Sequence, residues 1–206
     1  MSHNLTNDSN IDPSCTISDT ALIDTPNHIL NSSVISNNAQ ILPFNFIQNS
    51  TILAHTSVIH SVIKDSTIHS HCNIGPFAHI RDNSVIHEFC RIGNFCEIKN
   101  STIGKYTKVS HHSYVGDSII GKYCNIGCGV IFANYDGIKK HTITLGNNVF
   151  VGCNSVLIAP LNIADNTYIC ANSTVTKDTN NGDLIIGRID AVAKPHKGLG
   201  RYLPKH

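Results

Sequence analysis

The chain has 206 residues, a formal net charge of +1 at pH 7 and no tryptophan. A chain of this length usually forms one domain. Its charge balance lacks the basic excess that favours nucleic-acid binding, and the sequence has no run of about eighteen apolar residues that could span a membrane. We therefore expect one soluble domain whose partners include neither nucleic acid nor a membrane.

Residues 1–30 are rich in Asn, Ser, Thr and Asp and show weak periodicity, so we expect an irregular N-terminal segment or a cap. The start, MSHNLTNDSN, lacks the basic residues and the apolar run of a secretory signal. The eight cysteines include no CxxC pair, and free thiols in such number favour a reducing compartment. These features predict a cytoplasmic protein.

Within residues 31–183 an aliphatic residue recurs at about every sixth position, with steps of five at Ile98 to Ile103 and at Val115 to Ile120. This period is neither the value of about 3.6 of a helix nor the alternation of a strand, and over many units it indicates the coils of an all-β, parallel β-helix. Three six-residue faces close a triangular coil of about eighteen residues, so one aliphatic side chain per face points into a narrow core. The clearest series are Ile68, Ile74, Ile80, Ile86, Ile92 and Ile98, and then Leu145, Val151, Leu157, Ile163, Ile169 and Val175.

Four residues after the aliphatic position the coils carry small side chains, among them Cys72, Cys90, Cys96 and Cys124. We predict that these cysteines are buried, because a free cysteine packs as a small hydrophobe. The chain also has thirteen histidines. We expect most of them on the flat outer faces of the coils.

The step from Phe132 to Leu145 is thirteen residues, one more than two hexads, so we expect an extruded loop near 133–143. Functional residues are common on such loops. The stretch DTNNGDL after Lys177 breaks the period, and residues 184–206 are predicted to form a basic C-terminal arm that meets a partner surface or an anion.

Residues 68–190 contain a series of motifs, which are IGPFAHIR at 74–81, EIK at 97–99, HHSYVGD at 111–117, NYDG at 134–137 and GRID at 187–190. In type and order these motifs resemble the acetyltransferase domain of the GlmU family. The resemblance implies a left-handed β-helix that forms a homotrimer with its active site between subunits. It also implies acetyl transfer from acetyl-CoA to the amine of glucosamine-1-phosphate, a step for which no metal is expected.

The resemblance places His111 at the position of the general base that takes a proton from the sugar amine. Histidine suits this task because its pKa lies near working pH, so it accepts and returns a proton within one turnover. Glu97 of the EIK motif is expected to orient or polarise the site.

The resemblance implies five substrate contacts. Arg81 and Lys99 would bind the sugar phosphate, Arg81 through its forked guanidinium group and Lys99 through its compact positive charge. Tyr114 and Asn125 would hold the sugar by hydrogen bonds, and Lys140 would lie on the loop near the same pocket.

The implied acetyl-CoA contacts lie along a groove between coils. Asn134 and Tyr135 would lie at the reactive end, Ala171 would let the cofactor approach the backbone, and Arg188 would meet a phosphate. Cys128 and Cys153 stand where the family has alanine and serine. Both thiols are expected to preserve binding.

The sequence contains no glycine-rich nucleotide loop of a uridyltransferase, so we expect a separate enzyme to supply that step of the pathway. Three alternatives stay open. The acceptor could be another amino-sugar phosphate. His55 and His60 could belong to a zinc site of the carbonic anhydrase kind, which β-helix trimers also house. The coils could also be a non-catalytic scaffold.

Overall fold

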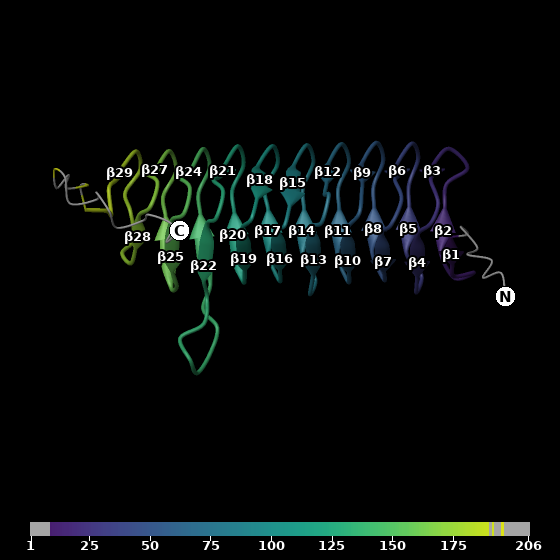
Figure 1. Ribbon diagram of the computed structural model, residues 1–206, viewed down its shortest axis with the longest axis horizontal. Helices are drawn as coiled ribbons and strands as arrows, with labels where there is room; N and C mark the ends of the chain where they lie inside the picture. The colour runs from purple at the N-terminus through teal and green to yellow at the C-terminus, as the bar shows by residue number, and fades with distance from the viewer. Residues whose placement is uncertain (1–8, 190, 192–194, 196–206) are drawn as a thin grey trace, which may run out of the picture.

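The structure is a computed structural model that describes residues 9–189, 191 and 195. The described residues wind into one long column of coils, from which a loop projects (Figure 1). Within this part of the chain twenty-nine short strands form three parallel sheets, which we call faces A, B and C. The described part of the chain contains no helix, and hence none that could cross a membrane. This architecture agrees with the left-handed β-helix predicted from the sequence.

Face A contains ten strands. They are β1 (Asn10–Ile11), β4 (His28–Leu30), β7 (Phe46–Gln48), β10 (Val62–Lys64), β13 (His79–Arg81), β16 (Glu97–Lys99), β19 (Tyr114–Gly116), β22 (Ile131–Ala133), β25 (Val156–Ile158) and β28 (Thr174–Val175).

Face B contains nine strands. They are β2 (Thr16–Ile17), β5 (Val34–Ile35), β8 (Thr51–Ile52), β11 (Thr67–Ile68), β14 (Val85–Ile86), β17 (Thr102–Ile103), β20 (Ser118–Ile120), β23 (Ile143–Leu145) and β26 (Leu161–Ile163).

Face C contains ten strands. They are β3 (Leu22–Ile23), β6 (Gln40–Ile41), β9 (Ser57–Val58), β12 (Asn73–Ile74), β15 (Arg91–Asn94), β18 (Lys108–His111), β21 (Asn125–Ile126), β24 (Phe150–Val151), β27 (Tyr168–Ile169) and β29 (Leu184–Ile185).

The chain visits faces A, B and C in turn, so nearly every strand pairs with the strand three places later. On face A, for example, Ile80 pairs with Ile98 in parallel register. Both side chains are fully buried in the core, as the six-residue period predicted. The predicted burial of Cys72, Cys90, Cys96 and Cys124 is also confirmed, and all eight cysteines lie in the described residues as free thiols.

The coils begin earlier than the boundary expected near residue 30. Residues 10–30 contain β1 to β4, which pair in register with the following coil. Ile11, Ile17, Ile23 and Ile29 continue the six-residue period there, although many polar neighbours obscure it. Strand β29 likewise extends the coils past residue 183 by pairing with β27. Residues 1–8, and all of the predicted arm beyond 189 except 191 and 195, lie outside the described residues.

Three corners join the faces, and we name each by the two faces that it links. Residues at the B/C and C/A corners adopt positive φ and stack their rings on the next coil. The B/C stack contains His55, His71, Phe89, Tyr106 and Tyr123, and the C/A stack contains Phe44, His60, Phe77, Phe95 and His112. Four of these are histidines that we had expected on flat faces. Coils about 4.8 Å apart bring the corner rings into stacking distance, which explains the difference.

The projecting loop, residues 134–142, leaves face A after β22 and returns to face B at β23 (Figure 1). Tyr135 and Lys140 form an antiparallel bridge at its base. Asp136 accepts hydrogen bonds from the backbone N–H groups of Ile138 at 2.7 Å and Lys139 at 2.8 Å, and it contacts His141 Nε2 at 2.6 Å. These hydrogen bonds lower the pKa of Asp136 to about 2, and the bond from the Lys139 backbone has the largest effect. The loop therefore has a hydrogen-bonded structure of its own.

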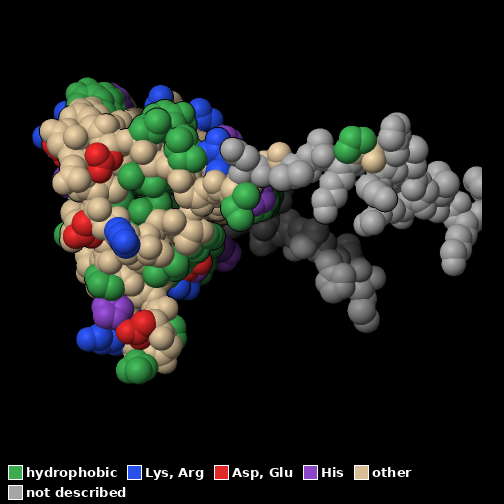
Figure 2. All heavy atoms as spheres, turned by 90° about the vertical axis from the view of Figure 1, so that its left-hand side faces the viewer, with side chains coloured by type: hydrophobic (Ala, Val, Ile, Leu, Met, Phe, Trp, Pro, Cys, Tyr) green, Lys and Arg blue, Asp and Glu red, His purple; other side chains and the backbone are tan. Residues whose placement is uncertain are grey.

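Figure 2 looks along the column from the end that carries β29. The loop stands out from one corner of the body and carries basic, acidic, histidine and hydrophobic side chains. It leaves from the A/B corner, because β22 and β23 belong to faces A and B. This corner is where most of the predicted substrate residues lie.

Candidate active site

Arg81 and Lys99 are neighbours on face A, because β13 and β16 pair with these two residues in register. The guanidinium of Arg81 contacts Glu97 Oε1 through Nη2 at 2.7 Å and Asp82 Oδ2 through Nη1 at 2.8 Å. Glu97 therefore orients the Arg81 side chain of the same protomer. The predicted pair of cations is brought together, with its charges balanced by carboxylates.

Lys99 is buried, and its Nζ lies 3.6 Å from Asp82 Oδ2 and 3.8 Å from Asp117 Oδ2. Lys140 of the loop lies against it. The neighbouring ammonium group of Lys99 lowers the pKa of Lys140, because the two positive charges repel each other. Three cationic side chains, from two strands and the loop, thus converge at the A/B corner.

Asp117 links these elements, and the sequence reasoning assigned it no role. Its carboxylate accepts a hydrogen bond from Asn100 Nδ2 at 2.6 Å and another from Asn134 Nδ2, and it faces Lys99. Its position as the last residue of the motif HHSYVGD was the available signal. Asp117 therefore fixes the start of the loop relative to the buried cation.

Gly116 allows this close packing. A Cβ at that position would lie 2.4 Å from Tyr114 Oη and 2.7 Å from Asn134 Nδ2. The amide of Asn134 also lies 3.5 Å from the Tyr114 hydroxyl. Tyr114 and Asn134, predicted for substrate and cofactor, are therefore neighbours.

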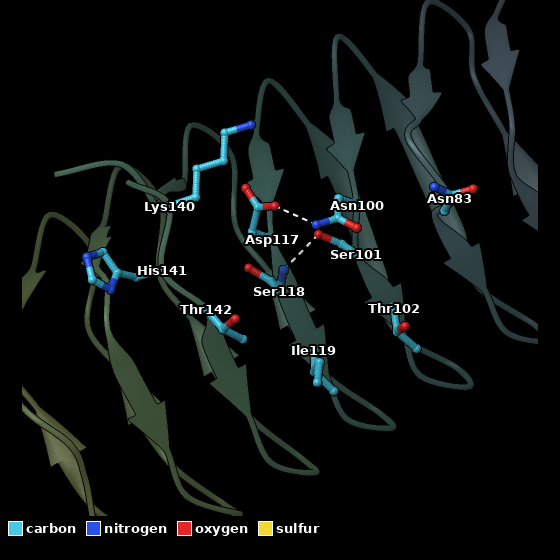
Figure 3. A pocket seen from close by; sticks show the side chains of 10 residues that line it. All are labelled: Asn83, Asn100, Ser101, Thr102, Asp117, Ser118, Ile119, Lys140, His141 and Thr142. Atoms are coloured by element: carbon cyan, nitrogen blue, oxygen red, sulfur yellow. Dashed lines mark hydrogen bonds between the residues drawn. The ribbon is translucent and has the colours of Figure 1, made fainter. Parts of the chain in front are cut away.

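A surface cleft of about 290 Å³ opens beside this cluster. Figure 3 shows Asp117 and Asn100 joined by their hydrogen bond, with the side chain of Lys140 extending towards them from the loop. The cleft continues along the A/B corner past Ser101, Ser118 and Thr142. It offers hydroxyl and amide groups next to the converging cations.

His111 lies at the end of β18, at the C/A corner, and is exposed. Its Nδ1 lies 2.8 Å from Asn94 Oδ1, and the two residues pair in register between β15 and β18. A carbonyl oxygen only accepts hydrogen bonds, so this contact favours the tautomer with the proton on Nδ1, in which Nε2 of the neutral ring has a free lone pair. Asn94 was missed by the sequence reasoning, although the pairing of Ile92 with Val109 places it beside His111.

A column of exposed small side chains continues from His111 along the C/A corner. Cys128, Cys153 and Ala171 each lie two residues after a buried aliphatic residue of face C, and these aliphatic residues pair from coil to coil. His111 occupies the same position one coil earlier, after Val109. At the far end Arg188 donates from Nη1 to the carbonyl oxygen of Ala171 at 3.4 Å. An extended ligand would find little steric hindrance along this column.

The two groups of residues flank face A. The His111 column precedes the face A strands, whereas Arg81 and Lys99 lie at their carboxyl ends. A strand of three residues separates them, which is about 10 Å. Tyr135 projects from the loop with 61% of its surface exposed. Asn125 lies on face C, paired with Lys108 and Phe150, and so stands apart from the A/B cluster.

The HxxxxH pair considered for zinc is not brought together. His55 stacks on His71 at the B/C corner, with ring centroids 4.8 Å apart. His60 lies between Phe44 and Phe77 at the C/A corner. The two histidines therefore point from different edges of the column.

The sequence matches one protein-family model twice, at residues 7–88 and 62–136. The model is described as the GMPPB C-terminal domain, and the two matches span more than half of the chain. The chain belongs to this family. The overlap of the two matches reflects the repetition of similar coils.

Curated relatives carry the name bifunctional protein GlmU. The protein from Trichormus variabilis is 42% identical over 192 residues, covering 90% of this chain and 43% of that protein. The protein from Clostridium perfringens is 46% identical over 140 residues, covering 68% of this chain and 31% of that protein. The resemblance to GlmU is thus confirmed. This chain spans less than half the length of these relatives.

A solved structure shares the fold. The UDP-N-acetylglucosamine acyltransferase from Campylobacter jejuni superposes with a TM-score of 0.52 at 15% identity, covering 83% of this chain and 69% of that chain. At this level of identity the likeness concerns the β-solenoid alone.

Proposed function

We propose that this chain transfers an acetyl group from acetyl-CoA to the amine of glucosamine-1-phosphate, with His111 as the general base. The observation that carries the proposal is the contact between His111 Nδ1 and Asn94 Oδ1, which leaves Nε2 free to accept a proton at an exposed corner. The GlmU relatives support a sugar acceptor and an acyl donor.

In the proposed mechanism the amine attacks the thioester carbonyl carbon while His111 Nε2 takes the proton that the amine loses. The C–S bond then breaks, and His111 returns the proton to the leaving sulfur, so that N-acetylglucosamine-1-phosphate and CoA are released. The base is therefore regenerated in each turnover. Asn94 keeps the imidazole in the required tautomer by accepting the Nδ1 proton.

Arg81, Lys99 and Lys140 would bind the sugar phosphate. A phosphate would compete with Asp82, whose side chain is 44% exposed and pairs with both Arg81 and Lys99. It would also separate the two ammonium groups of Lys99 and Lys140 by a negative charge, which favours binding. Tyr114 and Asn125 would hold sugar hydroxyls.

Acetyl-CoA would lie along the C/A column. Cys128, Cys153 and Ala171 are small and exposed, so the donor could approach the coil backbone, and Arg188 would meet one of its phosphates. Asn134 and Tyr135 would contact the donor from the loop. Because the loop leaves from the other edge of face A, we propose a homotrimer in which neighbouring copies complete each site. That the protein is cytoplasmic, and that a separate uridyltransferase acts in the pathway, remain predictions.

The acceptor is tested by thiol release from acetyl-CoA in the presence of four amino sugars. We expect glucosamine-1-phosphate to give the highest kcat/KM, ahead of glucosamine-6-phosphate, free glucosamine and a nucleotide-linked amino sugar. A preference for glucosamine-6-phosphate would support the proposed acetyltransferase activity but show that the acceptor differs from the one proposed. If none of the four acceptors stimulates thiol release, the proposal is contradicted and a non-catalytic scaffold is favoured.

Replacing Asn94 with alanine is expected to lower kcat roughly 5–10-fold, since one hydrogen bond contributes about 1 kcal/mol. The isosteric Asn94→Asp variant keeps the acceptor and adds a negative charge that favours a protonated imidazole. The acidic limb of its pH–rate profile should therefore move to higher pH. An unchanged profile in Asn94→Asp, together with full activity in Asn94→Ala, would remove Asn94 as a positioning residue.

Alkylation with iodoacetamide should modify Cys128 and Cys153 first, because both are exposed whereas burial raises the pKa of the Cys96 and Cys124 thiols. Saturating CoA should slow the modification of Cys128 and Cys153. CoA should not change the rate at which Cys15, which lies on the first coil, is modified. Peptide mass spectrometry measures the rate at each cysteine. Equal rates at Cys128 and Cys153 with and without CoA would exclude the C/A column as the donor site.

A further inference from the structure

We propose that His69, His87 and Glu88 form a binding site for a divalent transition-metal ion, with Zn²⁺ as the ion best suited to it. One ligand atom from each residue lies within 4.8 Å of the others. All three side chains are partly buried. The site belongs to the B/C corner, whereas the candidate active site flanks face A.

The register of the coils positions the two histidines. Ile68 pairs with Ile86, so the residues that follow them, His69 and His87, lie on successive coils with ring centroids 4.9 Å apart. The backbone N–H of His69 donates to the Ile86 oxygen at 2.8 Å, and that of His87 donates to the Ile103 oxygen at 2.9 Å. The imidazoles are therefore held on a rigid, hydrogen-bonded backbone.

Glu88 follows His87 in the same turn and supplies the third ligand. Within the described residues Glu88 forms no salt bridge, and Nζ of Lys105 on the next coil lies 5.1 Å from the centroid of the Phe89 ring. The carboxylate oxygens of Glu88 are therefore available to a metal ion.

Two imidazoles and one carboxylate are a donor set that zinc uses, with bonds of about 2.0–2.2 Å and a fourth position for water or an anion. Binding would draw the three ligand atoms, which lie within 4.8 Å of one another, to tetrahedral spacing around the ion. A cleft of about 370 Å³ lined by His87, Glu88, Lys105 and Lys122 leaves room for the fourth ligand. Its two lysines would favour an anion there.

The test is calorimetric titration of the full, tag-free chain with ZnCl₂, together with a count of bound zinc per chain. We expect one ion per chain, and a loss of affinity of about tenfold or more in each of His69→Ala, His87→Ala and Glu88→Gln. The matched control is His71→Ala, because His71 also stacks on a histidine of the adjacent coil, His55, outside this cluster.

Thermal unfolding gives a second readout that separates lost binding from lost folding. Zinc should raise the Tm of the wild type and of His71→Ala but not the Tm of the three cluster variants, which are compared with their own metal-free Tm. Absence of stoichiometric binding, an equal loss in His71→Ala, or binding that survives in all three cluster variants would overturn the proposal. Each readout is independent of acetyl transfer.

Discussion

Replacing His111 with alanine is expected to lower kcat for acetyl transfer about 10²–10⁴-fold, the usual contribution of a positioned general base. The reason is the loss of Nε2, the atom that takes the amine proton in the proposed mechanism. The folded state should be little affected, because His111 is exposed. Steady-state thiol release from acetyl-CoA at saturating acceptor measures the effect.

The control is the adjacent His112→Ala. His112 has positive φ and stacks on Phe95 with ring centroids 4.8 Å apart, so its side chain extends the corner stack. Its loss should change kcat by only a few fold. Wild-type turnover in His111→Ala, or an equal fall in both variants, would remove His111 from the mechanism.

Phe132→Ala is expected to cost about 3–5 kcal/mol of the free energy of unfolding, as large-to-small changes of buried aromatic residues do. Phe132 is fully buried in β22 and pairs in register with Leu157 of the next coil. Removing the ring would leave a cavity in the narrow core of the coil. Urea unfolding followed by circular dichroism gives the value.

The matched variant is Ile131→Ala on the same strand. Ile131 is 40% exposed because its side chain points outward, so its truncation should cost about 1 kcal/mol or less. Since β22 leads directly into Asn134, Phe132→Ala should also loosen the loop. Similar unfolding free energies for the two variants would contradict the placement of Phe132 in the core.

The core was predictable because each coil repeats one buried aliphatic residue per face, a pattern carried by the local sequence. The loop was predictable for the same reason, as an interruption between Phe132 and Leu145. The start of the coils was not, because Ile11 and Ile17 are surrounded by polar residues that weaken the period. A short hydrophobic series in a polar segment gives too little signal.

Site contacts between coils were harder to predict. Asn94 and His111 are seventeen residues apart, and so are Asn134 and Asp117. Such contacts depend on register, which shifts wherever a coil has seventeen rather than eighteen residues. The family motifs supplied the residue types at these positions, and the register of the folded chain determined which of them are neighbours. The ring stacks at the corners arise in the same way.

The most direct measurement is a crystal structure of this protein with CoA and glucosamine-1-phosphate. We expect the sugar amine within hydrogen-bond reach of His111 Nε2, about 2.6–3.2 Å, and the sugar phosphate on Arg81 and Lys99. CoA should follow Cys128, Cys153 and Ala171 along the C/A corner. A sugar bound with its amine away from His111, or CoA bound along a different corner, would contradict the account.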